Sequence, residues 1–155
     1  MKCSHPLKVA CIAAMLWALD PASPALAQIG VGTWIRQGGA ATHVEMTMTV
    51  EPCCNGGRRL TYRFGGINQI MSVESAFDGR EVPVLLDGKP SGETMAIKQI
   101  DSRHTSTVVK MNGKAFGISK STISADGRTL TVENDFSSSV GGNHAGRTTE
   151  TWVRK

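Results

Sequence analysis

Residues 78–136 read DGREVPVLLDGKPSGETMAIKQIDSRHTSTVVKMNGKAFGISKSTISADGRTLTVENDF, and this stretch decides the fold. One short phrase, Asp or Asn followed by Gly and a basic residue, returns between runs rich in Thr, Val and Ile. It occurs at Asp78-Gly79-Arg80, Asp87-Gly88-Lys89, Asn112-Gly113-Lys114 and Asp126-Gly127-Arg128. Asp and Asn tolerate a positive φ and Gly adopts one freely, so such pairs between alternating segments indicate tight β-hairpins. The stretch therefore predicts an antiparallel meander.

The residues before and after this stretch also have the pattern of short strands. Residues 43–51 alternate between apolar and polar side chains, which is typical of a strand with one face in water. Residues 52–57 are rich in turn formers, and residues 59–64 return as the second strand of a hairpin. With further strands expected at 32–35 and 148–154, the chain should contain about nine or ten strands.

The number of strands predicts how the sheet is arranged. A long meander has exposed edges unless it curls, and closure into a barrel removes those edges. We therefore predict an all-β fold, a single antiparallel up-and-down β-barrel of about 8–10 strands whose first and last strands pair. A β-sandwich is the alternative, but sandwiches usually need long crossover connections, and this chain has mostly tight turns.

The N-terminal segment, residues 1–27, is predicted to be a secretory signal peptide. A basic start is followed by an apolar run at 9–19 and by the small-residue site Ala25-Leu26-Ala27. Cleavage is expected after Ala27, so that residues 28–155 form the barrel domain of a secreted or periplasmic protein. The apolar run is far shorter than the ~20 residues that a membrane-spanning helix needs, and no membrane span is predicted.

Charge and motifs argue against several classes of function. The formal net charge is only +4 and the basic residues are dispersed, which does not favour nucleic-acid binding. The chain has no recognisable nucleophile motif, phosphate-binding loop or metal-ligand spacing, so we expect a protein without catalysis, metal or cofactor. His43, His104 and His144 are far apart in the sequence, and each is interpreted as a solvated residue.

Cys53 and Cys54 are the only cysteines after the signal peptide, and they are adjacent. The pair could be two partly exposed thiols in a turn, a vicinal disulfide, an intermolecular bridge or a soft-metal site. A bond between neighbours closes almost no loop, so it would contribute little to stability.

The start Gly32-x-Trp34, followed by a hairpin meander of this length, resembles the lipocalins and fatty-acid-binding proteins of the calycin superfamily. The segment 77–132 is similar to small exported bacterial lipocalin-like proteins of unassigned function. In lipocalins the Trp of this motif plugs one end of the barrel and an Arg near the last strand packs over it. The resemblance thus implies a structural role in barrel closure for Gly32, Trp34 and either Arg154 or Arg147.

The same resemblance implies a small hydrophobic ligand in the barrel interior. The fatty-acid-binding branch holds a carboxylate with an Arg-x-Tyr pair in its last strand, whereas this chain has Thr151-Trp152-Val153-Arg154 there. Fatty-acid specificity is therefore not implied.

Strand alternation predicts which side chains face the interior. The expected ligand-binding residues are Val44, Met46, Met48, Tyr62, Phe64, Phe116 and Ile118, and Leu130 and Val132 are expected to face inward with them. Small barrels either fill their interiors or hold one small ligand, and Met adapts to varied apolar shapes. The alternative is a filled scaffold that contacts another protein or the cell envelope through its loops. An enzyme would need a polar constellation inside the barrel, which the sequence pattern does not indicate.

Overall fold

Ten antiparallel strands make up almost all of the structure, a computed structural model that describes residues 29–38, 45–137 and 145–155. The strands are β1 (Gly32–Gln37), β2 (Met46–Cys53), β3 (Gly57–Phe64), β4 (Ile70–Ser75), β5 (Asp78–Leu86), β6 (Lys89–Gln99), β7 (His104–Met111), β8 (Lys114–Ile123), β9 (Thr129–Phe136) and β10 (Gly146–Arg154). One short 3-10 turn, η1 (Cys54–Gly56), joins β2 to β3. Within the described residues, no helix is long and apolar enough to cross a bilayer.

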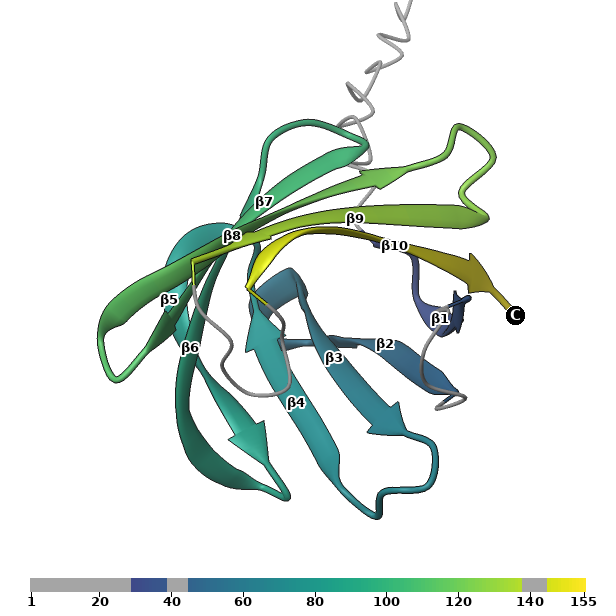
Figure 1. Cartoon of the computed structure of the whole chain (residues 1–155). Helices are drawn as coiled ribbons and strands as arrows, with labels where there is room; N and C mark the ends of the chain where they lie inside the picture. The colour runs from purple at the N-terminus through teal and green to yellow at the C-terminus, as the bar shows by residue number, and fades with distance from the viewer. Residues whose placement is uncertain (1–28, 39–44, 138–144) are drawn as a thin grey trace, which may run out of the picture.

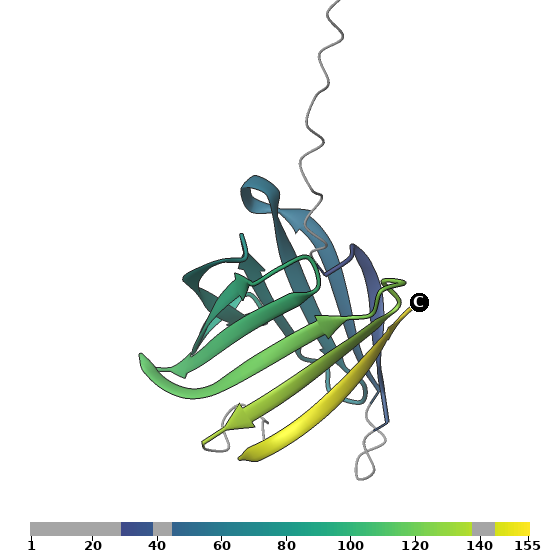
Figure 2. The same cartoon turned by 90° about the horizontal axis from the view of Figure 1, so that it is seen from above.

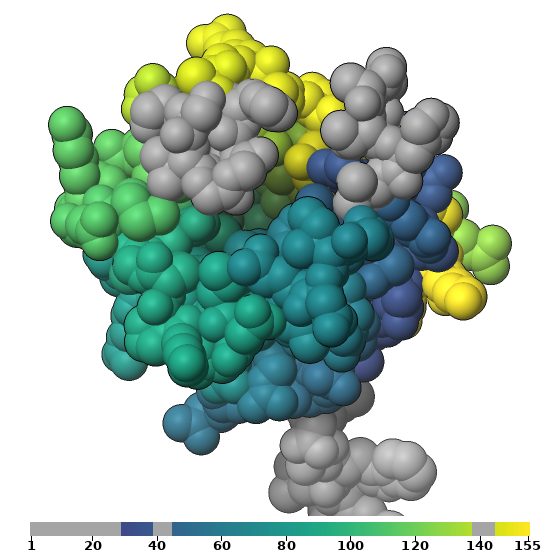
Figure 3. Space-filling view, turned by 60° about the horizontal axis from the view of Figure 1, so that its bottom comes forward, coloured from purple at the N-terminus to yellow at the C-terminus, as the bar shows by residue number. Residues whose placement is uncertain are grey.

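Each strand pairs with the next along the chain, and β1 pairs with β10, so the sheet closes on itself (Figure 1). Seen from above, the strands wrap around one axis and β10 lies beside β1 (Figure 2). In the space-filling view the teal residues from the middle of the chain form a continuous surface on this face of the barrel (Figure 3). The predicted closed barrel is confirmed, and the sandwich alternative is wrong.

Two of the repeated phrases form the predicted hairpin turns. Asp87 and Gly88 have φ values of 50° and 77°, and Asn112 and Gly113 have φ values of 49° and 81°. Positive φ at both central residues matches the twist of the flanking strands. A third phrase lies in a longer turn, where the backbone N–H groups of Gly127 and Thr129 donate to Ser124 at 2.9 Å each.

The first phrase is not a turn, which corrects the prediction. Asp78 and Gly79 open strand β5, and the register of β5 against β6 shifts between Asp78 and Glu81. The β4–β5 ladder reaches only Val73 opposite Val84, so the reversal between them is wide rather than a two-residue turn. Phe77 within it has a φ of 59° and a side chain that is only 4% exposed, and Gly79, with a φ of 87°, takes part in the bulge.

The core lies toward one end of the barrel, which we call the closed end. Its buried apolar side chains come from most of the strands and from Phe77 and Ile29, which lie outside them: Ile29, Trp34, Met48, Val50, Leu60, Val73, Phe77, Ile97, Ile123, Leu130 and Trp152. Trp34 is fully buried at its centre. A second, smaller cluster joins Val109, Phe116 and Phe136, which are contributed by β7, β8 and β9.

The first and last strands meet at the closed end. Trp34 lies opposite Arg154 in the register, and its indole N–H donates to the Gly30 carbonyl at 3.0 Å. The Arg154 guanidinium donates to the Val31 carbonyl and lies against Gly30 and Gly32, where an added Cβ would come within 3.2 Å of it. Gly32 also has a φ of 140°, which favours Gly. Gly32, Trp34 and Arg154 therefore occupy the junction for which the sequence predicted them.

Arg147, the other candidate for this role, lies elsewhere. Its guanidinium is exposed and pairs with Asp135 at 3.0 Å, on the outside of β9 and β10. Arg154 is thus the arginine of the closure.

Candidate ligand-binding site in the barrel interior

Cross-strand register identifies the inward face of β2 and β3. Met46 lies opposite Phe64, and Met48 lies opposite Tyr62. Directly opposed residues of an antiparallel pair project to the same face, so these four predicted residues share one face of the sheet. Met48 is only 2% exposed, and Met46 and Tyr62 pack against the core from its edge.

The remaining predicted residues have different outcomes. Phe116 is buried with Phe136, with ring centroids 5.8 Å apart, although in the second cluster rather than the main core. Ile118 is 47% exposed, so the prediction that it faces inward is wrong. A bulge in β8 explains the error. Val109 lies opposite Gly117 and Lys110 opposite Ala115, so Phe116 has no partner in the ladder and the alternation of β8 shifts there by one residue. Val44 lies outside the described residues.

Leu130 and Val132 do face inward on β9. Leu130 is 2% exposed and lies opposite Trp152, and Val132 packs against the core. Each of these two residues lies directly opposite a residue of β10, so they also identify which side chains of β10 face inward.

Charged residues also lie on the inward face, next to Trp152. Arg36 of β1 pairs with Glu150 of β10 at 3.4 Å between Nη1 and Oε1. The other carboxylate oxygen of Glu150 accepts the Trp152 indole N–H at 3.2 Å. The two charged side chains keep 22% and 28% of their surface exposed, so they are reachable by a small molecule or water.

Tyr62 lies deep in the barrel opposite this pair. Its ring meets that of Trp152 edge-on, with centroids 6.1 Å apart and planes at 71°. Burial raises the pKa of the Tyr62 phenol, and the negative charges of Glu150 and Glu93 raise it further. Yet part of the Tyr62 surface stays accessible.

Glu93 of β6 is the most unusual group on the inward face. It is only 6% exposed, and loss of hydration raises the pKa of its carboxyl. Its alternation with Met95 and Ile97, which pack in the core, directs it inward, and its charge acts on Tyr62. Among the described residues no hydrogen bond or ion pair reaches this carboxyl. A carboxyl with little hydration and no protein donor favours either a proton or a ligand that supplies a donor.

Neutral polar groups line the neighbouring part of the wall. Asn134 of β9, 9% exposed, accepts the Ser119 hydroxyl at 2.7 Å and donates to Thr148 at 3.4 Å. These three residues lie opposite one another on β8, β9 and β10. The interior therefore combines apolar surface with a polar side.

These polar residues were not predicted from the sequence. Glu150 is two residues from Trp152, so extending the alternation of the last strand inward could have found it, as it could have found Arg36 from Trp34. No such alternation in the sequence points to Glu93. It follows Gly92, which has a φ of 85°, and the register of β5 against β6 shifts near it between Pro83 and Leu85.

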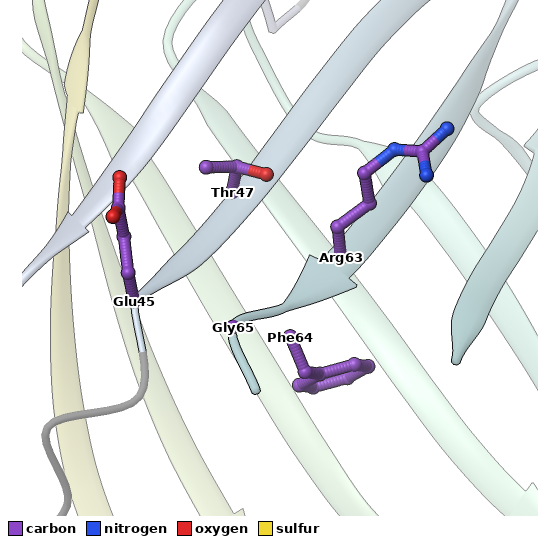
Figure 4. A pocket seen from close by; sticks show the side chains of 5 residues that line it. All are labelled: Glu45, Thr47, Arg63, Phe64 and Gly65. Carbon is purple, nitrogen blue, oxygen red and sulfur yellow. The ribbon is translucent and has the colours of Figure 1, made fainter. Parts of the chain in front are cut away.

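A separate shallow depression of about 240 Å³ lies at the ends of β2 and β3. Glu45, Thr47, Arg63, Phe64 and Gly65 line it, and Phe64 points to the opposite side of the strand from Thr47 and Arg63 (Figure 4). Thr47 and Arg63 are register partners on the outer face. The depression is therefore lined by outer-face residues together with Phe64 of the inward face.

The adjacent cysteines form a vicinal disulfide at the end of β2. Of the alternatives left open by the sequence, the structure contains this one. His104, in contrast, is held by Asp101, whose carboxylate lies 2.8 Å from Nδ1 on the surface. His43 and His144 lie outside the described residues.

Comparison with known proteins identifies the architecture. No protein-family model and no curated protein matches the sequence. Solved structures of the fluorescent protein UnaG do match. The wild type gives a TM-score of 0.59 at 14% identity, covering 81% of this chain and 96% of that one. A single-residue mutant gives 0.60 at 12% identity, covering 82% and 96%.

The chain has a closed antiparallel β-barrel fold similar to that of UnaG. Identities this low show the fold alone, so the chemistry of the interior must come from the residues of this chain. Its charged groups are the Arg36–Glu150 pair and Glu93.

Proposed function

We propose that the protein is an exported, non-catalytic carrier whose barrel interior binds a small amphipathic ligand with an apolar body and a hydrogen-bond donor or cation at one end. The observation that carries the proposal is Glu93, a carboxyl that is 6% exposed, faces the interior and has no partner among the described residues.

The electrostatics of the interior favour a ligand with a hydrogen-bond donor or a cation over a ligand with a carboxylate. Arg36 is already paired with Glu150, so it offers no free positive charge to a ligand carboxylate. Glu93 adds either a negative charge or a neutral carboxyl to the same space. A ligand ammonium or N–H group would satisfy Glu93, whereas a carboxylate would meet like charge nearby.

The apolar body of the ligand has a matching wall. Partly buried apolar side chains pack at the edge of the core, where they have surface left to cover: Met46, Tyr62, Val82, Met95 and Val132. Covering such surface stabilises a complex by about 25 cal/mol per Å². Flexible Met side chains can fit ligands of different shape.

The test uses three probes that share one alkyl chain and differ in the head group, namely dodecylamine, dodecanol and dodecanoate. Each probe is titrated against an apolar dye bound to purified residues 28–155, and the fall in dye fluorescence measures displacement. We expect saturable binding in the order amine, alcohol, carboxylate. Glu93→Gln should weaken amine binding by about tenfold, equivalent to ~1.4 kcal/mol, and leave the alcohol nearly unchanged.

Glu133→Gln is the matched control, because Glu133 is exposed on the same barrel, on β9. It should bind all three probes as the wild type does. Absence of saturable binding by any probe would contradict a carrier function, and a preference for dodecanoate that survives Glu93→Gln would contradict the role given to Glu93.

A further inference from the structure

The vicinal disulfide lies on the outside of the barrel at the closed end, away from the proposed ligand site. Cys53 is the last residue of β2 and lies opposite Gly57, and Cys54 opens the turn η1. Cys53 is half-buried and Cys54 is exposed. Because the bond joins neighbours, it closes no loop of the chain, and its reduction removes no long-range link from the fold.

A third donor is brought to this turn by the neighbouring strand. Glu74 of β4 lies opposite Arg59 of β3, on the outer face. Gly57 allows β4 to come close, because a Cβ there would lie only 2.3 Å from the Ser75 carbonyl oxygen. As a result the sulfurs of Cys53 and Cys54 and a carboxylate oxygen of Glu74 all lie within 4.8 Å of one another.

The carboxylate is already oriented for a further ligand. Arg59 contacts Glu74 through Nε at 2.7 Å and Nη2 at 2.6 Å, and both contacts are to Oε1. The second oxygen, Oε2, has no contact of this kind among the described residues. A ligating carboxylate held by a second residue is a common feature of metal sites.

We propose that Cys53, Cys54 and Glu74 form a redox-gated site for one thiophilic divalent cation of the Zn²⁺ or Cd²⁺ class. Thiolate ligands select soft and borderline metals, and two sulfurs with one carboxylate oxygen provide three of the four positions of a tetrahedral ion. Water fills the fourth. The disulfide form cannot bind, because its sulfurs carry no negative charge.

Gating requires an external dithiol as reductant. Its thiolate attacks one sulfur of the disulfide, the Cys53–Cys54 bond breaks, and the reductant leaves as its own disulfide. The protein gains two electrons and two protons and becomes a dithiol. Binding of the cation then releases those two protons and forms two metal–sulfur bonds.

The experiment titrates Cd²⁺ into residues 28–155 that have been reduced and freed of reductant without oxygen. Thiolate-to-metal absorption in the ultraviolet reports sulfur ligation, and the thermal unfolding midpoint is a second readout. We expect saturation at one ion per chain and a rise in the midpoint, because Glu74 joins the two thiolates only in the folded chain, which therefore binds the ion more tightly than the unfolded chain does. Zn²⁺ should displace Cd²⁺ from the same site.

Variants separate the three donors. The oxidised protein and the double variant Cys53→Ser, Cys54→Ser should show no such absorption. Glu74→Gln should bind about tenfold more weakly, a difference of ~1.4 kcal/mol. Glu51→Gln, an exposed carboxylate opposite Arg59 on the other side of β3, is the matched control and should bind as the wild type does.

Several results would overturn the proposal. Saturation at one ion per two chains would replace it with an intermolecular site. Equal binding by Glu74→Gln and the wild type would remove the third donor. Loss of the β-sheet circular dichroism on reduction would show that the disulfide, rather than a metal, is what this turn requires.

Discussion

Tyr62 shows at the level of one residue how the interior differs from a filled core. Its phenol is surrounded by protein and by the carboxyl groups of Glu93 and Glu150, and all three influences raise its pKa. Its ring packs edge-on against Trp152, which fixes its orientation. The phenol is therefore a neutral polar group on the proposed binding surface over the whole physiological pH range.

An alkaline titration tests this environment directly, because the chain contains a single tyrosine. In the folded protein we expect no phenolate absorbance near pH 10, whereas the protein unfolded in urea should titrate around that pH. A phenolate midpoint near 10 in the folded protein, with its circular dichroism unchanged, would contradict the burial of Tyr62.

The sign of the accompanying stability change follows from linkage. Above the unfolded pKa the unfolded chain loses the phenol proton while the folded chain keeps it, so the free energy of unfolding falls as pH rises beyond about 10. Tyr62→Phe removes the titrating group, and its stability should decline less over that interval in urea unfolding experiments.

At the level of elements, β8 and β9 are fitted together around one glycine. Gly117 lies opposite Phe136, and a Cβ at position 117 would come within 1.8 Å of the Phe136 ring. Gly117 therefore makes room for the ring that, with Phe116 and Val109, forms the second cluster. A glycine in a strand interior usually weakens it, and here the close approach of a side chain explains its presence.

We expect Gly117→Ala to destabilise the protein by about 1–3 kcal/mol, because the added methyl must displace the ring. Urea unfolding gives this difference. In the Phe136→Ala background the same substitution should cost far less, since the clash is then absent, and the double-mutant cycle reports their coupling. Equal costs in both backgrounds would show that the ring is not what excludes a side chain at position 117.

The turns show at the same scale where local sequence suffices. Asp87-Gly88 and Asn112-Gly113 have the predicted turn conformation because their own backbone preferences and the strand twist agree. Asp78-Gly79 has the same composition but opens a strand, because burial of Phe77 outweighs the local preference. Ile118 was placed on the wrong face for a related reason, a register shift that the alternation of one strand cannot reveal.

At the scale of the whole molecule, the barrel is closed because β1, near the start of the described chain, pairs with β10 at its end. Their ladder pairs Trp34 with Arg154, and Arg154 covers the Gly30–Gly32 segment from outside. Closure removes both sheet edges and encloses the interior. Such a pairing between distant segments costs loop-closure entropy before it stabilises the fold.

Arg154→Ala tests how much the side chain of Arg154 contributes to this closure. The main-chain N–H of residue 154 still donates to Arg128, so the variant removes only the guanidinium contacts to Val31 and the glycines. We expect a loss of about 1 kcal/mol in the free energy of unfolding in urea. Arg128→Ala, also exposed, is the control and should change stability less. A loss no larger than that of the control would show that closure rests on the strands and Trp34 alone.

The sequence by itself determined the class of fold, since alternation, Asx-Gly turns and the number of strands are local properties that leave closure as the way to remove edges. It also placed Gly32, Trp34 and Arg154 at the junction, and Met46, Met48 and Tyr62 on the inward face. Only the tertiary structure decided the polar side of the interior and the grouping of the two cysteines with Glu74 outside it. The charge of Glu93 acts on Tyr62, and Glu74 lies near Cys53 and Cys54, across strands whose bulges and close approaches set the register. Contacts between strands depend on register, and a shift of one residue reverses every side chain.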